Sequence, residues 1–378
     1  MDKIKKVMTH KSGNFVFSRK YDCEKLAEYL IEANILNATI KDIPILPASM
    51  AKIDEELMIR SIFSTAAIEG NPLSEEKVSD IILKKRDALN DKQMEIYNLK
   101  NLYFEIQQLP PDFDLSLDFE KTAKTFQSII TENINYSDNI PGKYRNHPVK
   151  VGDGEHGGID TPPKILADIK ILMKSFADWH KTNLSDENCY IKAALAHLYI
   201  GLIHPFGQGN GRTARAIEGL ILQQNKIKYL PKMLSNYYYK NIDEYYWAFS
   251  NTIQSIKKKE YDVTPFIEFV LKGVTESFFE LKLKVMFYIK TLALRDYYDY
   301  LLNNKKVNKR QEEFLKILLN TNVNFSLKDL YVNDIFKLLF LKVSERTARR
   351  DIDSLLKQKL LFVRNDGKLQ LNFKVMTG

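Results

Sequence analysis

One loop decides the fold: its residues read His204-Pro205-Phe206-Gly207-Gln208-Gly209-Asn210-Gly211-Arg212-Thr213-Ala214-Arg215. The run 187–203 before the loop is strongly apolar, and the run 212–224 after it keeps helical periodicity, so we expect the loop to join a central core helix to a second helix. Gly207, Gly209 and Gly211 let backbone N–H groups come close to a ligand, and amides just before a helix N-terminus favour an anion. The loop therefore predicts an anion-binding site.

Two arginines and a histidine add chemistry to this loop. Arg212 and Arg215 are three residues apart and project near the same helix face, while His204 at the start of the loop can serve as a base. Together these features indicate a phosphate site with a proton acceptor. The loop is not a Walker loop, because no Gly-Lys-Ser/Thr follows, and it is not a Rossmann loop, because no strand precedes it.

Composition narrows the class of protein. A chain of 378 residues is too long for one ordinary core, so we expect two or three domains. The net charge of +8 suits a nucleotide or nucleic acid, but on charge alone we favour a lysine-rich solvated surface. Cys23 and Cys189 lie outside any Cys/His cluster, which argues against structural zinc and a disulfide framework. The chain begins without an apolar signal core and has no bilayer-length apolar run, so we expect a cytoplasmic protein.

Apolar residues recur at helical spacing along most of the chain. We expect helices at 24–34, 53–68, from Ser74 onward, and at 90–108, 116–133, 164–181, 187–203, 212–224, 238–256 and 264–303. Prolines and glycines are dense in 141–163, where Val149-Lys150-Val151 is expected to form a short strand facing 156–159 in a projecting hairpin. The polar stretch 303–309 is expected to be a linker.

The last part of the chain has its own pattern. Helices are expected at 310–320, 326–340 and 344–359, followed by strands at 361–364 and 368–373 around the turn 365–367. Three helices and a hairpin predict a winged helix-turn-helix. The expected fold class is mainly α, with a helical core and a small β-hairpin flap. We divide the chain into an N-terminal helical region at 1–110, a core at 111–302 and the winged-helix domain at 310–378.

The loop 204–215 resembles the motif of the Fic family, His-Pro-Phe-x-(Asp/Glu)-Gly-Asn-Gly-Arg-x-x-Arg, and departs from it only at the fifth position, Gln208. The resemblance covers about residues 20–260. Members of that family mostly transfer AMP from ATP to a Ser, Thr or Tyr hydroxyl of a target protein. The resemblance therefore implies an enzyme with a Fic core that binds ATP and catalyses in-line attack at the α-phosphorus, with pyrophosphate leaving.

The resemblance implies a role for each residue of the loop. His204 would take the proton from the target hydroxyl, and Phe206 would anchor the loop in the core. The others would contact phosphates: Gly209, Asn210 and Gly211 as an anion hole for the α- and β-phosphates, Arg212 at the β-phosphate and Arg215 at the γ-phosphate.

Gln208 stands where the family has a carboxylate that holds Mg²⁺ against the phosphates. A glutamine offers one neutral carbonyl oxygen, which is a weaker ligand for a hard cation. We rank three outcomes: the metal still binds through phosphates, water and the amide; activity is reduced; or the chemistry differs.

An upstream segment resembles the inhibitory motif of the family, (Ser/Thr)-x-x-x-Glu-(Gly/Asn). It runs from Thr65 to Gly70 and contains Glu69. By itself the segment is typical of the end of a helix with an exposed glutamate. The resemblance implies that Glu69 pairs with Arg215 in a bidentate ion pair, so that ATP binds only in an unproductive pose.

Two further segments resemble the family. The run Pro141–Arg145 with Val149–Val151 resembles the approach to the flap, so residues 142–160 are expected to clamp a target segment by strand addition, the alternative being an incidental surface hairpin. Downstream, Tyr245 or Tyr246 is expected to line the adenine pocket, although aromatic pairs are more often core residues. We expect His197 to be a buried structural histidine.

The leading hypothesis is an auto-inhibited protein adenylyltransferase that also modifies itself. One alternative is a DNA-binding regulator whose Fic core senses nucleotide or is weakly active, and another is transfer of UMP, phosphocholine or a similar group by the same loop. Removal of the modification, with Glu69 taking part, is a further family activity.

The domain at 310–378 carries Arg346, Arg349 and Arg350 at helical spacing, but nearby carboxylates dilute their charge. For this domain we weigh DNA contact slightly below protein docking or dimerisation.

Overall fold

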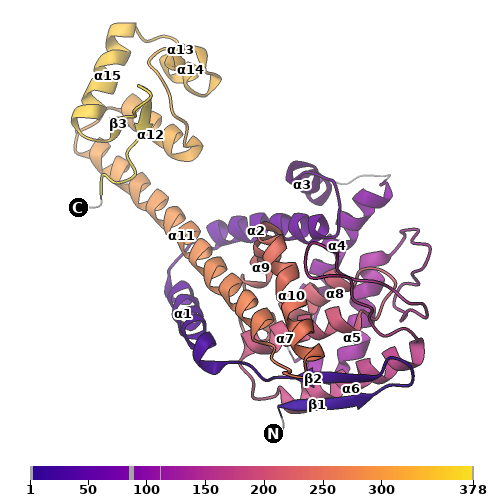
Figure 1. Cartoon of the computed structure of the whole chain (residues 1–378). Helices are drawn as coiled ribbons and strands as arrows, with labels where there is room; N and C mark the ends of the chain where they lie inside the picture. The colour runs from indigo at the N-terminus through magenta and orange to yellow at the C-terminus, as the bar shows by residue number, and fades with distance from the viewer. Residues whose placement is uncertain (1–2, 85–88, 111, 377–378) are drawn as a thin grey trace. The chain divides into compact units, whose positions relative to one another are not determined.

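The computed structural model describes residues 3–84, 89–110 and 112–376. Helices dominate the ribbon (Figure 1), which confirms the mainly α fold class. The chain forms two compact units that divide between Leu281 and Lys282, inside the long helix α11 (Thr264–Asn303). This division differs from the linker expected at 303–309, because the last part of α11 contributes Leu294 and Tyr298 to the second core.

The first unit consists of a hairpin and a bundle of helices. Its elements are β1 (Ile4–Met8), β2 (Asn14–Ser18), α1 (Cys23–Asp42), α2 (Pro47–Ile68), α3 (Glu75–Leu83), α4 (Asp91–Gln108), α5 (Leu115–Thr131), α6 (Leu166–Asn183), α7 (Cys189–Ile203), α8 (Asn210–Gln224), α9 (Pro231–Lys240), α10 (Ile242–Lys257) and the first part of α11. The helix expected at 238–256 is two helices. They meet at Asn241, whose side-chain amide donates to the Tyr237 carbonyl at 2.9 Å and competes with the regular helix bonds.

The hairpin β1–β2 was not expected from the sequence. Its strands pair antiparallel with Ile4 opposite Ser18, and Gly13 turns the chain with φ +75°. Phe17 is fully buried and stacks on Trp179 of α6 with ring centroids 5.7 Å apart. The only sequence signal for this hairpin is the alternation of Phe15 and Phe17 after a glycine turn, which is too short to stand out.

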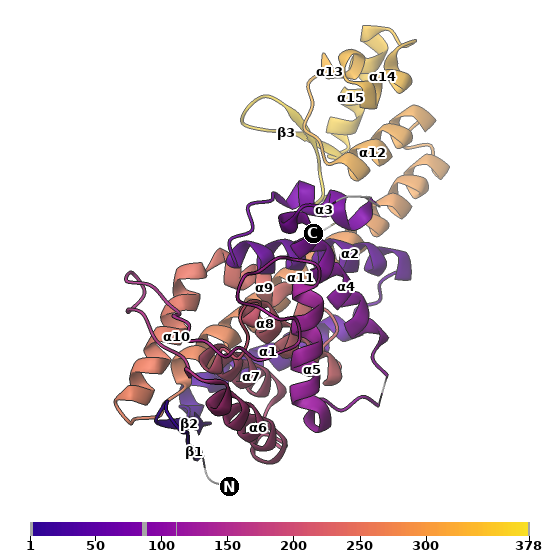
Figure 2. The same ribbon diagram turned by 90° about the vertical axis from the view of Figure 1, so that its right-hand side faces the viewer.

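Helix α7 lies at the centre of the first unit (Figure 2) and packs along α8. The side chains of Leu195, Leu198 and Ile203 are all inaccessible to solvent, because α7 is apolar on every face. The loop between α7 and α8 is therefore fixed at both ends by buried helices.

The segment 141–163 forms less β-structure than the sequence predicts. One antiparallel bridge joins Val151 to Asp160, with N–O distances of 3.1 and 2.8 Å, and the rest of the strand expected along 149–151 is irregular backbone. Gly152, Gly157 and Gly158 have positive φ and curl the chain between the bridged residues. The bridge partner is residue 160, just beyond the expected 156–159.

The second unit has its own core around Phe314 and Phe325. Its elements are the last part of α11, α12 (Lys309–Thr321), α13 (Asp329–Val332), α14 (Asp334–Phe340), α15 (Glu345–Lys357), β3 (Leu361–Val363) and β4 (Leu369–Leu371). Strands β3 and β4 pair antiparallel as expected, and Phe325 bridges to Leu369 on the other side. The expected helix 326–340 is broken at Asn333, which caps α14. Among the described residues, no helix is long and apolar enough to cross a membrane.

A buried carboxylate ties the N-terminal hairpin to α6. Asp168 accepts hydrogen bonds from the backbone N–H groups of His10, Lys11 and Ser12 at 2.7, 3.1 and 2.9 Å, and from the Ser12 hydroxyl at 2.6 Å. Burial alone would raise the pKa of Asp168, but these donors outweigh it and hold the pKa below its usual value.

We expect Asp168→Asn to lower the free energy of unfolding by about 1–3 kcal/mol at neutral pH, because a charged acceptor of several donors is lost. The folded-state pKa is lowered, so this contribution is fully present above the ordinary pKa of an aspartate and is lost as the pH falls through the folded-state value. Denaturation of the native protein and the variant should therefore converge in acid. Asp178→Asn, an exposed change in the same helix, is the control, and an equal loss in both variants would contradict the assignment.

Candidate active site

The loop 204–210 is held in one conformation by its own residues. His204 caps α7 with φ +49° in the left-handed region, which a residue other than glycine rarely adopts, and its N–H donates to the Ile200 carbonyl at 2.9 Å. Gly207 lies against the backbone of residues 138–139, where an added Cβ would collide with the Asp138 carbonyl oxygen. Phe206 is fully buried, with its ring 5.4 Å from that of Tyr144.

Asn210 closes the loop. Its side-chain oxygen accepts from the Phe206 N–H at 2.9 Å, and its side-chain nitrogen donates to the Phe206 carbonyl at 2.8 Å. Helix α8 starts at this residue after Gly209, which has φ +80°, so the helix begins inside the loop and not at 212. The backbone N–H groups of the first turn of α8 lack partners within the helix and carry the positive end of its dipole. The side chain of Asn210 thus holds the conformation of the loop. Its backbone N–H is one of the groups at the start of α8 that could bind an anion.

Two residues that the sequence reasoning did not select also hold the loop. The buried guanidinium of Arg145 donates to the carbonyls of His204 and His147 at 2.7 and 2.6 Å, at the C-terminal end of α7. The Gln127 amide nitrogen donates to the Gln208 carbonyl at 3.0 Å, and its oxygen accepts from the Gly142 N–H at 2.7 Å. Arg145 ends the run that resembles the approach to the flap and Gln127 lies within an ordinary helix, and only the folded chain brings them to the loop.

The surroundings of His204 hold its side chain in the neutral form. Burial lowers its pKa to about 4, and the nearby positive charge of Arg145 lowers it in the same direction. The imidazole is therefore neutral at pH 7 and can act as a base. Its Nδ1 atom lies 3.4 Å from the Gly201 carbonyl oxygen, an arrangement that leaves Nε2 for a ligand if Nδ1 carries the proton.

Arg215 is buried and contacts the end of α2. Its Nε donates to the Thr65 hydroxyl at 2.8 Å, and its Nη2 donates to the Thr65 carbonyl at 3.2 Å and to Oε1 of Glu69 at 2.8 Å. The ion pair is made through one oxygen of Glu69 and is not the bidentate pair expected from the sequence, because the remaining donors of the guanidinium are taken by Thr65 and Tyr245. The Glu69 side chain is 27% exposed.

Glu69 lies directly over the start of α8. A Cβ built on Gly211 would collide with Glu69 Oε1, so the carboxylate occupies the space beside the first turn of that helix. Burial raises the pKa of Glu69, but Arg215 and then Arg212 lower it by more, so the carboxylate is ionised. Gly70 follows with φ +80° and ends α2: its N–H donates to Ala67 and the next residue's N–H donates to Ala66.

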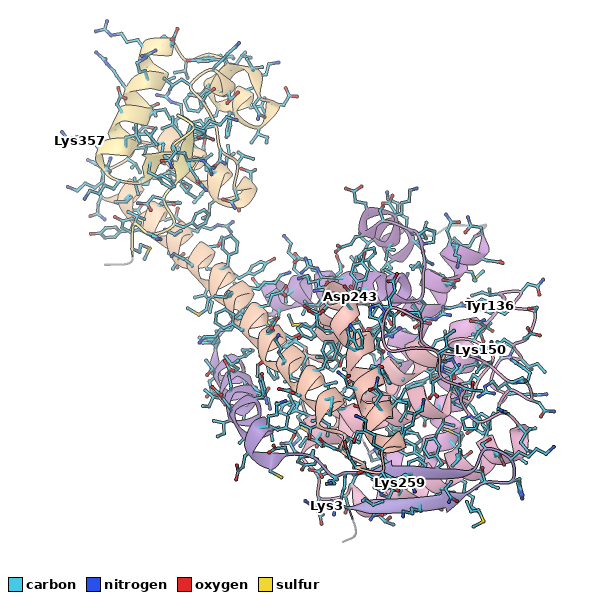
Figure 3. All side chains as sticks on the ribbon, viewed as in Figure 1. Lys3, Tyr136, Lys150, Asp243, Lys259 and Lys357 are labelled. Carbon is cyan, nitrogen blue, oxygen red and sulfur yellow. The ribbon has the colours of Figure 1, made fainter. Side chains whose placement is uncertain are left out.

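Arg212 is also buried but is less completely paired. Its Nη2 donates to the Tyr136 hydroxyl at 3.5 Å, and its Nη1 lies 3.9 Å from Oε2 of Glu95. Tyr136 lies in the loop after α5 and is labelled in Figure 3. Glu95 in turn accepts from Asn71 at 2.9 Å, which links it to the segment just after α2. Within the described residues, Nε and Nη1 of Arg212 are buried without a hydrogen-bond partner.

A cavity of about 350 Å³ joins several of the expected site residues. They come from the loop, the end of α2, the irregular segment 150–160 and α10, and include His204, Gly211, Arg215, Glu69, Tyr245 and Tyr246. Arg212, Gln208 and Thr65 do not line this cavity. Gln208 is exposed, and no group of three His, Cys, Asp or Glu suited to a metal exists in the part of the chain that the structure describes. The residues present therefore do not form a cage for Mg²⁺.

Tyr245 belongs to a buried chain of polar contacts behind Arg215. Its hydroxyl accepts from Nη1 of Arg215 at 3.3 Å and lies 2.9 Å from Nε2 of His197. The Nδ1 atom of His197 lies 3.2 Å from Oε2 of Glu218, and Oε1 of Glu218 accepts a hydrogen bond from the Tyr238 hydroxyl at 2.8 Å. His197 is fully buried, as expected for a structural histidine. This series of polar contacts positions the Tyr245 hydroxyl against the Arg215 guanidinium.

Comparison with known proteins finds similarity in the part of the chain that contains the loop. The model of the Fic/DOC family matches residues 116–222, which include the loop and α8. The chain carries a Fic/DOC domain. A crystal structure of a Fic family protein from Desulfovibrio desulfuricans has the same fold, with a TM-score of 0.57 at 18% identity over 93% of this chain and 97% of that one.

Curated relatives extend the likeness beyond the Fic/DOC domain itself. Protein adenylyltransferase Fic of Drosophila willistoni is 26% identical over 227 residues, and the protein of the same name from Drosophila ananassae is 27% identical over 230 residues. Each alignment covers 59% of this chain but 41% of the relative. The chain is thus homologous to these proteins and spans about two fifths of their length.

The clamp made by Asn210 gives a direct test of loop geometry. Asn210→Ala leaves the buried N–H and carbonyl of Phe206 without their partners, and we expect the free energy of unfolding to fall by about 2–4 kcal/mol. Asn251→Ala, at an exposed position of α10, is the matched control. Chemical denaturation measures both, and indistinguishable midpoints would show that the clamp does not hold the loop.

Proposed function

We propose that the Fic/DOC domain is an auto-inhibited protein adenylyltransferase, which transfers AMP from ATP to a Ser, Thr or Tyr hydroxyl of a protein, itself included. One observation carries the proposal: a neutral His204, the first turn of α8 and Arg215 face the same cavity, with the Glu69 carboxylate bonded to that arginine. The names of the homologous proteins support the same activity.

The residues suggest how the reaction proceeds. The amides at the start of α8 and the guanidinium groups would bind the triphosphate, and Tyr245 or Tyr246 would contact the adenine. The target hydroxyl oxygen would attack the α-phosphorus while His204 takes its proton. The bond from the α-phosphorus to the oxygen bridging to the β-phosphorus breaks, and pyrophosphate leaves. Catalysis here rests on positioning and on neutralising the phosphate charge.

We expect the protein incubated with ATP to gain the mass of AMP on its own hydroxyl groups, and we expect His204→Ala to abolish that gain. Label in the α-phosphate should be transferred, whereas label in the γ-phosphate should not. Mass spectrometry after incubation with each nucleoside triphosphate also tests the alternative that another nucleotide is transferred. Transfer that persists in His204→Ala would contradict the proposed base.

The contact between Glu69 and Arg215 supports a brake on this activity. In this proposal Glu69 holds the guanidinium that the γ-phosphate needs, so ATP binds in a pose from which transfer is slow. Glu69→Gly removes the carboxylate and frees Arg215.

We expect Glu69→Gly to raise self-labelling by at least about tenfold, because a charge-assisted contact worth roughly 1.5–3 kcal/mol no longer opposes the productive pose. Glu55→Gly, an exposed change on the same helix, is the control. Equal labelling of the native protein and Glu69→Gly would argue against the brake.

Gln208 is the position at which the metal dependence of the proposed reaction can be tested. We expect Gln208→Asp to increase transfer in the presence of Mg²⁺, because a carboxylate is a stronger ligand for a hard cation than an amide. Initial rates with and without a chelator measure the effect. If Asp gives no gain and the native rate is independent of metal, Mg²⁺ has no part at this position.

The surroundings suggest partners for the domain. We propose that a target segment docks along 142–160, where the bridge between Val151 and Asp160 leaves backbone beside the cavity.

We further propose that 310–378 is a winged helix. Arg346 and Arg350 are exposed on α15, whereas Arg349 pairs with Glu345 at 3.3 Å. Salt-sensitive binding of duplex DNA by the full chain would favour a DNA-binding regulator, and concentration-dependent self-association would favour dimerisation.

A further inference from the structure

A second cavity, of about 390 Å³, lies on the other side of Arg212 and Arg215. Of the loop 204–215, only these two arginines line it, and neither His204 nor Glu69 does. Its walls come from α2, α4, α8 and the start of α9, all within the first unit. The cavity is therefore separate from the one that holds the proposed reaction, although the two share Arg215.

The polar end of this cavity is a buried charge with unused donors. The Arg212 side chain is 4% exposed, and its Nε and Nη1 atoms are buried without a hydrogen-bond partner among the described residues. The nearest carboxylate oxygen, on Glu95, is 3.9 Å from Nη1, too far for a hydrogen bond. Leaving buried guanidinium donors unmade costs free energy, so an acceptor that enters from the cavity is favoured.

Much of the rest of the cavity is apolar, and two lysines also line it. Leu99, Leu102 and Ile106 of α4 face Ala216 of α8 across it. At the rim, Lys228 is exposed, and Lys232 is held by Asp54 with N–O distances of 2.7 and 2.6 Å. A largely apolar cavity lined by a guanidinium and two lysines suits a small anion with an apolar body. Its volume lies within the range of ligand pockets.

We propose that this cavity is a second ligand site, which takes a small amphipathic carboxylate whose charged group pairs with Arg212 and whose apolar body lies against α4. The anion beside Arg212 and the triphosphate of ATP then draw on the same pair of arginines, of which Arg215 lines both cavities. Each weakens binding of the other, and the coupling is reciprocal. This linkage to ATP rests on the proposed function, but binding of the carboxylate by itself does not.

The test uses octanoate as the probe and the full chain without nucleotide, so it does not depend on transfer activity. Calorimetric titration should show octanoate binding to the native protein, with octanol and acetate binding at least about tenfold more weakly because each lacks one half of the ligand. Ala216→Phe, which fills the chamber, should remove binding. Lys228→Glu at the exposed rim should weaken it about fivefold by charge repulsion, and Lys226→Glu, exposed but outside the cavity, should not change it.

Octanoate that fails to bind, that binds Lys228→Glu and Lys226→Glu equally, or that is matched by octanol would overturn the site. Because the Lys228 substitution is at the surface, it keeps the test decisive even where Ala216→Phe does not fold. A separate titration of ATP with and without saturating octanoate tests the linkage. Unchanged ATP affinity would overturn the linkage. The octanoate titration and the AMP-transfer assay would still decide the binding site and the transferase proposal separately.

Discussion

The first unit depends on how the buried positive charge of Arg215 is satisfied. A guanidinium in the interior is costly unless its donors are paired, and here the partners come from two other helices: Thr65 and Glu69 at the end of α2, and Tyr245 of α10. The same arginine faces the cavity beside His204. Satisfying the charge within the protein therefore brings the end of α2 to the place where an anionic ligand would bind.

The loop 204–210, in contrast, is held in one conformation by contacts that a ligand need not displace. Asn210 holds Phe206, Arg145 holds the carbonyl of His204, and Gly207 allows backbone contact that no other residue would permit. A neutral imidazole and the first amides of α8 are thus in place before any ligand arrives, so little reorganisation is needed at the moment of reaction. In the proposed function, a rigid loop and a contact at Glu69 that ATP can displace would together give a site that is assembled but inhibited.

Much of this site was visible in the sequence, for a physical reason. The loop is contiguous, so its glycines, arginines and histidine sit at spacings that encode helix starts and close backbone approach, and the pairing of Glu69 with Arg215 followed from the resemblance. The supporting contacts were not visible. Glu95, Gln127 and Asp168 are single polar residues whose partners lie tens of positions away, and no local pattern distinguishes them from surface residues. Too much hairpin was predicted in the irregular segment 141–163, because strand propensity competes there with four glycines at positive φ.

In the proposed function, Glu69 and a γ-phosphate compete for Arg215. Comparing the affinities of ATP and ADP for the native protein and for Glu69→Gln, which keeps the shape of the side chain but removes its charge, tests this claim most directly. We expect the native protein to bind ATP and ADP with similar affinity, because the γ-phosphate gains no guanidinium, and we expect the variant to prefer ATP by about tenfold. The same preference for ATP in both proteins would contradict it.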